Sequence, residues 1–472
     1  MGANLEANAL QSAARETVAA LVARARAAQA AYERDDQARV DEVATACGWA
    51  IMKPGNNRRL AELAVRDTGL GNVADKIAKN HRKTLGLLRD IQGVRTVGVI
   101  AEYPERGVTE IARPVGVVAA ITPSTNPGAT PANQIINALK CGNAVILAPS
   151  PKGHSTCAQL LEFIHDEFRK IGANADLVQV LPAPVTKEAT HELMRQADLV
   201  AATGSQSNIR AAYSSGRPAI GVGQGNVVSI VDASAELADA AAKIARSKTF
   251  DNATSCSSEN ALVILAPVYE AMLAQLAAQG GVLLDTGEKA KLQAVMFPAG
   301  KLSPDTTAQS AERIAGLAGL GRSGSFLMVE ETGTGRAHPF SGEKLAPVLA
   351  VYRASDFDEA CALTRRIYDY QGKGHSVSIH TRDEAQVMRL GLEMPVARVI
   401  VNQAHCIATG GSFDNGLPFS LSMGCGTWGG NSFSDNMHWR HFLNITRIAR
   451  VIPERVPAED GIFGAYHARY GR

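Results

Sequence analysis

A cysteine in a polar, hydroxyl-rich segment is the residue of this sequence best suited to nucleophilic chemistry. Cys256 lies in the segment 249–260, which reads TFDNATSCSSEN. A helical pattern over 235–248 precedes this segment and a β-rich run over 261–265 follows it, so we expect Cys256 on a helix-to-strand connection. Structural cysteines usually lie among apolar neighbours, whereas a nucleophilic thiol must be reachable and close to groups that stabilise thiolate. An unreactive loop or core thiol is the alternative that the segment leaves open.

Strand and helix patterns alternate on both sides of this cysteine, which predicts an α/β fold of two lobes with doubly wound sheets. We expect the lobes over 1–231 and 232–428, followed by a C-terminal return segment and tail over 429–472, in which 434–447 looks helical. Residues 95–112 are predicted to form a protruding hairpin. In the first lobe the expected strands are 115–121, 143–148, 177–181, 197–202 and 226–231, and the expected helices are 130–140, 154–171, 187–196 and 205–214.

Composition narrows the class of protein. A chain of 472 residues exceeds one ordinary core, and its 46% hydrophobic content is that of a globular protein. A net charge of +2 without a basic block argues against nucleic acid or an anionic membrane as the main partner. The seven dispersed cysteines show no metal-binding spacing, so we expect reduced thiols and no metal. No apolar stretch approaches the roughly 20 residues that span a bilayer, and we expect a cytoplasmic protein.

Two of the predicted strands end in turns that could bind a ligand. The first strand leads into 122–128 (TPSTNPG) and the fourth into 203–205 (TGS). Ligands of doubly wound sheets lie beyond the carboxyl ends of the strands, and free N–H groups of a strand-to-helix turn can meet a phosphate. The Gly-x-Gly-x-x-Gly fingerprint of many dinucleotide sites does not follow the first strand. An ordinary connection is the alternative for each turn.

Six segments, taken in order, resemble the aldehyde dehydrogenase superfamily and, within it, the CoA-acylating branch. They are 122–127 (TPSTNP), 213–218 (YSSGRP), 221–226 (GVGQGN), 250–259 (FDNATSCSSE), 343–348 (EKLAPV) and 425–432 (CGTWGGNS). The resemblance covers essentially the whole chain. It implies a first lobe that binds a nucleotide, a second lobe that carries the catalytic cysteine, and a hairpin and tail for oligomerisation.

The resemblance also implies chemical roles. Cys256 would attack an aldehyde carbonyl, and the amide of Asn126 would stabilise the oxygen that becomes charged. Hydride transfer to a nicotinamide would leave a thioester on Cys256. A turn residue is the alternative for Asn126, and a solvent-exposed acid is the alternative for Glu343. The nucleotide is expected to contact Thr122, Pro123, Ser150, Lys152, Thr203, Gly204, Ser205, Gly223 and Glu343, the last through the nicotinamide ribose.

Two departures from the hydrolytic branch refine this expectation. Hydrolytic relatives carry a glutamate where this chain has Gly221, which has no side chain and cannot activate water. A thiol such as that of CoA can still take the acyl group, so the departure favours acylation of CoA. A second departure at 147–154 (LAPSPKGH) lacks the glutamate that would repel a 2′-phosphate. Lys152 could pair with that phosphate, which favours NADP over NAD, unless Lys152 is only a solvated helix-start residue.

The segment 425–444 is most similar to the acylating members that act on sulfoacetaldehyde, with those acting on succinate semialdehyde or acetaldehyde as alternatives. An anionic aldehyde needs a cationic or donor-rich pocket. The candidates for it are Arg217, His405, Thr409 and Ser412, although His405 could equally be structural. The resemblance implies that a homodimer or homotetramer interconverts sulfoacetaldehyde and sulfoacetyl-CoA. A hydrolytic dehydrogenase with another base, such as Glu259, and a catalytically silent scaffold are the rival interpretations.

Overall fold

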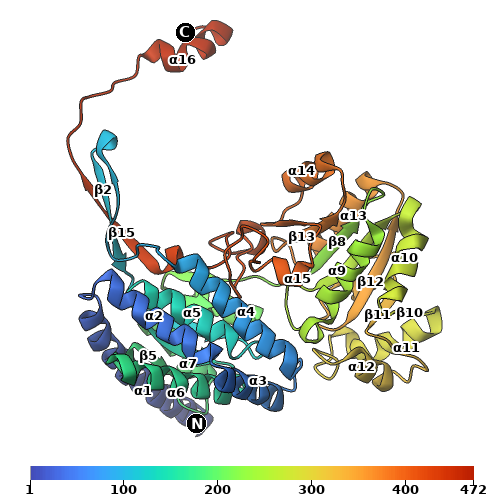
Figure 1. The fold of residues 1–472 in the computed structure, drawn as a ribbon, viewed down its shortest axis with the longest axis horizontal. Helices are drawn as coiled ribbons and strands as arrows, with labels where there is room; N and C mark the ends of the chain where they lie inside the picture. The colour runs from blue at the N-terminus through green and yellow to red at the C-terminus, as the bar shows by residue number, and fades with distance from the viewer. Residues whose placement is uncertain (1) are drawn as a thin grey trace.

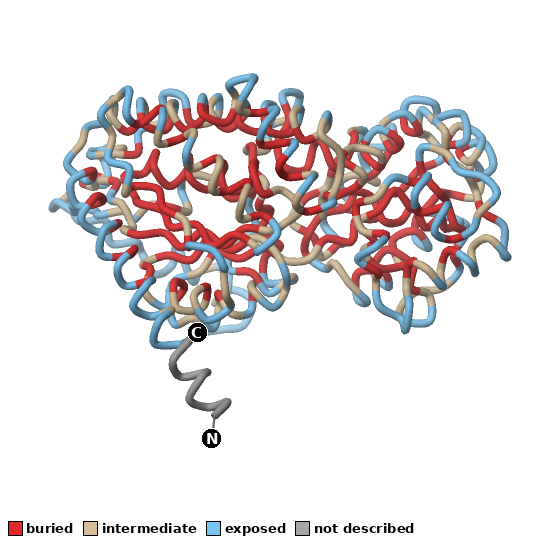
Figure 2. The backbone as a smooth tube through the Cα atoms, turned by 90° about the horizontal axis from the view of Figure 1, so that it is seen from below, coloured by how far each residue is buried: buried red, intermediate tan, exposed pale blue. Residues whose placement is uncertain are grey.

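The computed structural model describes residues 2–472, with side chains described from residue 11 onward. Two α/β lobes lie side by side, and a narrow antiparallel arm extends away from them (Figure 1). Buried backbone runs through the interior of both lobes, and exposed backbone forms their rim (Figure 2). Among the described residues, every helix is too short or too polar to span a bilayer.

The first lobe is built on five parallel strands in the order β5-β4-β3-β6-β7. Its central strands consist almost wholly of buried apolar residues, because helices cover both faces of a parallel sheet. Predicted strands 115–121, 143–148, 177–181 and 197–202 are found, each somewhat shorter or shifted. The bounds are β3 Val117–Thr122, β4 Ala144–Pro149, β5 Val178–Val180, β6 Leu199–Ala202 and β7 Ala219–Gly221.

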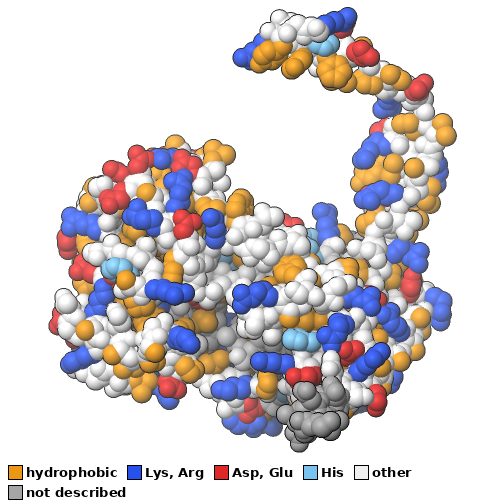
Figure 3. Space-filling model, turned by 180° about the vertical axis from the view of Figure 1, so that it is seen from behind, with side chains coloured by type: hydrophobic (Ala, Val, Ile, Leu, Met, Phe, Trp, Pro, Cys, Tyr) orange, Lys and Arg blue, Asp and Glu red, His pale blue; other side chains and the backbone are white. Residues whose placement is uncertain are grey.

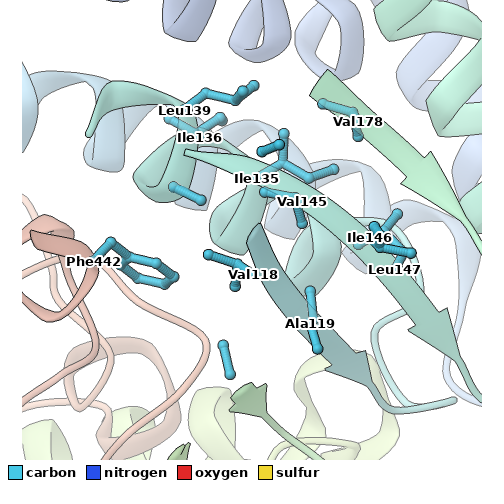
Figure 4. Close-up of a cluster of buried hydrophobic side chains, with 14 of the residues drawn as sticks. Val118, Ala119, Ile135, Ile136, Leu139, Val145, Ile146, Leu147, Val178 and Phe442 are labelled. Carbon is cyan, nitrogen blue, oxygen red and sulfur yellow. The ribbon is translucent and has the colours of Figure 1, made fainter. Parts of the chain in front are cut away.

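Five helices of this lobe, α1 and α5 to α8, pack on the sheet, and α2, α3 and α4 pack on α5 and α6 as an outer group. The bounds are α1 Gly2–Tyr32, α2 Gln37–Met52, α3 Pro54–Thr68, α4 Val73–Ile91, α5 Ala129–Lys140, α6 His154–Ile171, α7 Lys187–Gln196 and α8 Gln206–Tyr213. Helix α5 is buried along its whole length, and its Ile135 and Leu139 pack among the side chains of β3 and β4 (Figure 4). Phe442, far away in sequence, completes the same core with a fully buried ring (Figure 4). The C-terminal segment therefore folds back onto the first lobe.

The second lobe is built on seven parallel strands in the order β10-β11-β12-β9-β8-β13-β14. Their bounds are β8 Val227–Val231, β9 Glu259–Leu265, β10 Gly281–Leu283, β11 Phe326–Glu330, β12 Val348–Ala354, β13 Val377–His380 and β14 Val399–Val401. The strand predicted over 226–231 forms, but it lies in this sheet between β9 and β13 rather than in the first lobe. The chain thus changes lobe before residue 227, a few residues earlier than expected.

The helices of the second lobe connect these strands. Their bounds are α9 Leu237–Thr249, α10 Tyr269–Ala278, α11 Thr286–Met296, α12 Ala311–Leu317, α13 Phe357–Tyr370, α14 Glu384–Glu393 and α15 His405–Ala408. Helix α9 leads into the predicted cysteine segment, and β9 leaves it, as the sequence pattern indicated. Strand β9 is fully buried near the centre of the sheet, so the cysteine segment has a rigid anchor on its C-terminal side.

The arm is a three-stranded antiparallel sheet in the order β1-β2-β15. Strands β1 (Gly98–Tyr103) and β2 (Val108–Pro114) form the predicted hairpin. The helix predicted over 434–447 is wrong: this segment contains the strand β15 (Leu443–Ala449), which pairs with β2 along its whole length. The β-branched residues of β15 favour a strand, and β2 supplies the partner that a local pattern cannot reveal. Helix α16 (Glu459–Tyr470) follows at the far end of the arm (Figure 1).

Candidate active site

The cysteine segment adopts a backbone conformation that side-chain-bearing residues rarely adopt. Between α9 and β9, residues Asp251, Asn252 and Ala253 have φ angles of +52°, +52° and +58°. Each left-handed residue with a side chain costs about 1–2 kcal/mol, so the surrounding contacts must hold this turn in place. The turn directs Cys256 into a cavity of about 400 Å³ between the two lobes.

A buried carboxylate supplies those contacts. Oδ2 of Asp251 accepts hydrogen bonds from Nζ of Lys79 at 2.5 Å and Nζ of Lys76 at 3.1 Å, both on α4. The hydroxyl of Thr254 donates to the same oxygen at 2.7 Å, and Oδ1 accepts the backbone N–H of Asn72 at 2.9 Å. Burial alone would raise the pKa of Asp251, but the two lysines outweigh it and lower the pKa. The carboxylate therefore stays ionised and joins the cysteine turn to α4.

Lys79 also orients Asn126, the predicted oxyanion donor. Nζ of Lys79 donates to Oδ1 of Asn126 at 2.8 Å, which leaves the amide nitrogen of Asn126 without a partner among the described residues. Asn126 and Cys256 both line the cavity. The backbone N–H of Cys256 likewise makes no hydrogen bond to another described residue. Two N–H donors are thus available to an oxygen bound beside the thiol, which is the arrangement of an oxyanion hole.

His375 is the neighbour of Cys256 that sequence reasoning missed. Its Nε2 lies 3.4 Å from Sγ of Cys256, and its Nδ1 contacts the hydroxyl of Ser376 at 2.7 Å. Burial, together with the charge of Arg398, lowers the pKa of His375 well below its usual value, so the imidazole is neutral at pH 7 and has a lone pair, although burial also disfavours its protonated form. A histidine 119 positions away in the sequence, at the start of a buried strand, gives no local signal.

The thiol itself is protonated in the resting site. Burial raises the pKa of Cys256 to about 12, and the nearby carboxylate of Glu343 adds to the rise. Burial also raises the pKa of Glu343 to about 7, while its Oε2 accepts a hydrogen bond from Nε2 of Gln224 at 2.9 Å. Glu343 lines the cavity as predicted. It is the one carboxylate within the described lining, so its charge is the main negative influence on the thiol.

The position at which hydrolytic relatives carry a base is closed in this chain. A Cβ on Gly221 would lie 3.0 Å from Cγ2 of Ile209 and 3.1 Å from the ring of Tyr213, so a side chain at this position would require both neighbours to shift. Glu259, the other candidate base, is fully buried and lies outside the cavity lining, and its Oε2 accepts a hydrogen bond from the Ser247 hydroxyl. Neither position can present a carboxylate to water beside Cys256.

One end of the cavity fits a nucleotide. Eight of the nine residues predicted for the cofactor line it: Thr122, Pro123, Ser150, Thr203, Gly204, Ser205, Gly223 and Glu343. Thr122, Ser150 and Thr203 follow or end β3, β4 and β6, which are neighbours in the sheet. The hydroxyl oxygens of Ser150 and Thr130 are buried against the cavity without a hydrogen-bond partner in the described chain, which suits a polar ligand. Lys152 lies outside the lining and is exposed.

The structure does not bring the predicted substrate residues to the cavity wall. Arg217 is exposed, and its Nε donates to the carbonyl of Arg195. His405 and Thr409 are fully buried behind the wall; burial lowers the pKa of His405 to about 4, so it carries no charge at pH 7. Ser412 also lies outside the lining and accepts a hydrogen bond from Arg82.

The cations that do line the cavity all come from α4: Lys79, Arg82 and Lys83. The sequence of α4 contains a pattern from which these cavity cations could have been predicted. Lys76, Lys79 and Lys83 recur at the helical spacing of its buried face, where apolar residues are usual. Charged residues on the buried stripe of a helix indicate a functional role for that face.

Known proteins similar to this chain were found by sequence and by structure. A model of the aldehyde dehydrogenase family matches residues 5–321. Sulfoacetaldehyde dehydrogenase (acylating) of Cupriavidus necator is 67% identical over 98% of this chain and 94% of that protein. Succinate-semialdehyde dehydrogenase (acetylating) of Clostridium kluyveri is 36% identical over 94% of this chain and 98% of that protein. The crystal structure of an acetylating aldehyde dehydrogenase from Geobacillus thermoglucosidasius superimposes with a TM-score of 0.91 at 35% identity, covering 95% of this chain and 99% of that one.

The influence of Glu343 on the thiol can be measured directly. We expect Glu343→Gln to speed alkylation of Cys256 by iodoacetamide about tenfold at pH 9, because an ionised neighbour no longer repels the thiolate. At pH 6 the native Glu343, with its pKa of about 7, is mostly protonated, so the two proteins should react at similar rates. The measurement is the alkylation rate against pH, followed by mass spectrometry of the Cys256 peptide.

Two controls accompany this measurement. Cys256→Ser identifies the labelled residue, and Glu312→Gln removes an exposed carboxylate on α12 without touching the cavity. Equal or slower alkylation of the Glu343→Gln protein at pH 9 would contradict the assigned electrostatic effect.

Proposed function

We propose that this chain, which belongs to the aldehyde dehydrogenase family, is a CoA-acylating aldehyde dehydrogenase that interconverts sulfoacetaldehyde and sulfoacetyl-CoA. The observation that carries the acylating chemistry is a cysteine nucleophile with oxyanion donors beside it and a tightly surrounded glycine, Gly221, where hydrolytic relatives carry a water-activating glutamate. The substrate follows from the 67% identity to the Cupriavidus necator enzyme, which extends over nearly the whole of both chains.

The first step forms a bond between Cys256 and the aldehyde. The thiol proton passes to Nε2 of the neutral His375, 3.4 Å away, as sulfur attacks the carbonyl carbon. The carbonyl oxygen takes the negative charge and meets the amide of Asn126 and the backbone N–H of Cys256. Lys79 holds Asn126 in the required orientation, so these donors need no rearrangement during the reaction.

The predicted nucleotide residues would hold NADP or NAD at the other end of the cavity. When bound, this cofactor accepts hydride from the thiohemiacetal and leaves an acyl thioester on Cys256. Glu343 lines the same cavity as Cys256 and the predicted nucleotide residues, and it is suited to bind a ribose hydroxyl. Lys152 is exposed and forms no ion pair with a described carboxylate, so it remains our candidate for the phosphate that distinguishes NADP.

The second half of the reaction transfers the acyl group to CoA. His375 first releases to solvent the proton that it took from Cys256. The CoA thiol then passes its proton to His375 as its sulfur attacks the thioester carbon, and the Sγ of Cys256 regains that proton as its bond to the acyl carbon breaks. Water needs a general base to attack a thioester at a useful rate, whereas a thiolate does not. Gly221 has no side chain and Glu259 is buried away from the cavity, so neither position supplies such a base. Hydrolysis with Glu343 as base is the second candidate, favoured by the pKa of about 7 of that carboxyl.

The arm supports assembly with further copies of the chain. Exposed apolar side chains gather on α16 and along the arm (Figure 3), among them Val451, Val456, Ile462, Phe463, Tyr466 and Tyr470. Such a surface is typical of a contact between subunits. A homodimer or homotetramer stays our prediction, as does a cytoplasmic location.

Dependence on CoA tests the proposed reaction. With sulfoacetaldehyde and NADP alone, we expect a burst of NADPH no larger than the amount of Cys256, followed by a rate at least about 100-fold slower than with CoA, because Gly221 has no side chain to supply the carboxylate base that hydrolytic relatives use to activate water. The measurement is NADPH absorbance with and without CoA, with Cys256→Ala as the inactive control. Sustained formation of free sulfoacetate without CoA would contradict the acylating function and favour Glu343 as a base.

His375 has a measurable part in this reaction. We expect His375→Ala to lower kcat/KM by about 100-fold, because no neighbouring base then accepts the thiol proton. Its activity should also rise more steeply between pH 7 and 9.5, where hydroxide replaces the missing base. The half-buried His191 on α7, outside the cavity lining, provides the control variant His191→Ala. Initial rates unchanged in His375→Ala would exclude the histidine from proton transfer.

A further inference from the structure

Two cations of the cavity wall lack the carboxylate partner that buried charges normally have. Arg82 and Lys83 both line the cavity, and their hydrogen bonds lead to the loop 407–412. Lys79, one turn earlier on α4, is paired with Asp251. Neither Arg82 nor Lys83 forms an ion pair with any carboxylate of the described side chains. The charge of Asp414 raises the pKa of Arg82 and that of Asp90 raises the pKa of Lys83, but both carboxylates lie beyond ion-pair distance.

The hydrogen bonds of these two side chains leave donors free. Nη2 of Arg82 donates to the carbonyls of Ile407 and Gly411, at 3.0 and 3.1 Å, and to the Ser412 hydroxyl at 3.0 Å. Nζ of Lys83 donates to the carbonyl of Gly410. These acceptors are all neutral. Nε and Nη1 of Arg82 and two N–H bonds of Lys83 have no acceptor within the described part of the chain.

Burial makes this arrangement costly without an anion. Lys83 is 7% exposed, and burial lowers its pKa to about 7; burial likewise lowers the pKa of the half-buried Arg82. A buried cation is usually paired, because neutral acceptors replace only part of its hydration. A negatively charged ligand in the cavity would compensate both side chains at once.

The position of the pair relative to Cys256 limits the ligand. Arg82 and Lys83 follow Lys79 by three and four residues, so all three project from one face of α4 about one turn, or 5.4 Å, apart. Lys79 contacts the oxyanion donor Asn126. An anion at Arg82 and Lys83 therefore lies about one helical turn beyond the reacting carbonyl. A short aldehyde with a terminal anionic group spans that distance.

We propose that Arg82 and Lys83 form the subsite that binds the sulfonate of the aldehyde substrate. This assignment rests on the proposed function and names the residues that select its substrate. A sulfonate offers three acceptor oxygens, which can accept hydrogen bonds from the free N–H groups of Arg82 and from the ammonium of Lys83. The subsite replaces Arg217 and His405 as the source of positive charge, because neither presents a charge to the cavity.

A purely structural role for Arg82 makes a different prediction. Its Nη2 group connects α4 to the loop 407–412, and losing that connection would impair turnover of every aldehyde alike. A subsite for the anion affects only aldehydes that carry one. The ratio of kcat/KM for sulfoacetaldehyde to kcat/KM for propionaldehyde separates the two roles, since propionaldehyde is similar in length and has no charge.

The decisive variant is Arg82→Met, which keeps an unbranched side chain without its charge. We expect kcat/KM for sulfoacetaldehyde to fall about 10- to 100-fold, mainly through KM, from the loss of a charge-assisted pair. For propionaldehyde we expect a change below about threefold. Arg82→Lys should recover part of the sulfoacetaldehyde activity, and Lys83→Met should shift the ratio in the same direction. Equal losses for both aldehydes in Arg82→Met would overturn the proposal.

Arg89→Met is the matched control. Arg89 lies on the same helix, and its guanidinium packs 4.9 Å from the ring centroid of Phe419, as that of Arg82 does at 5.4 Å. It is exposed and outside the cavity lining, so its variant should keep the ratio of the native enzyme. A ratio that falls in Arg89→Met as far as in Arg82→Met would assign the effect to the helix surface and overturn the subsite.

Two further substrates separate failure of the subsite from failure of the proposed function. If the native enzyme prefers succinate semialdehyde and Arg82→Met abolishes that preference, sulfoacetaldehyde is the wrong substrate but the anion subsite holds. If the native enzyme prefers propionaldehyde, both fail. The KM for CoA, measured with propionaldehyde, should be unchanged in Arg82→Met. A rise of tenfold or more would reassign the two cations to the phosphates of CoA and overturn the proposal.

Discussion

The active site depends on one buried ionic contact, between Asp251 of the second lobe and Lys76 and Lys79 of α4 in the first. It holds three consecutive left-handed residues that would otherwise relax. Lys79 of this contact also orients Asn126, which follows strand β3 of the first lobe. Nucleophile and oxyanion donor come from different lobes, so their alignment requires a contact that crosses between the lobes. A buried ion pair is suited to this task because it is costly to break.

The electrostatics of the site favour an uncharged thiol and an uncharged imidazole at pH 7. Burial raises the pKa of Cys256 to about 12 and lowers the pKa of His375 well below its usual value, whereas Glu343, with a pKa of about 7, is partly ionised. Charge separates only when an aldehyde supplies an oxygen that the oxyanion donors can stabilise. Arg82 and Lys83 lie about one helical turn from Lys79, which contacts the oxyanion donor Asn126. The proposed subsite for the anionic tail therefore adjoins the position of the reacting carbonyl.

Much of the fold and of the candidate site could be predicted from the sequence, because these features depend on residues that are close together in the chain. Local patterns define strands and helices, and a polar segment between helix and buried strand marks Cys256. The turns after β3 and β6 were found because strand ends and their small residues are local features. His375 and strand β15 were missed because their partners are more than a hundred residues away in sequence. The cations of α4 were missed although their spacing was visible, and attention to buried lysines would have found them.

The most direct test is the mass of the enzyme during a single turnover. After mixing with sulfoacetaldehyde and NADP without CoA, peptide mapping should find a sulfoacetyl group on Cys256, and adding CoA should remove it and release an equal amount of sulfoacetyl-CoA. A Cys256 that stays unmodified while NADPH forms would contradict a covalent thioester. An acyl group that leaves as free sulfoacetate before CoA is added would contradict its transfer to a thiol.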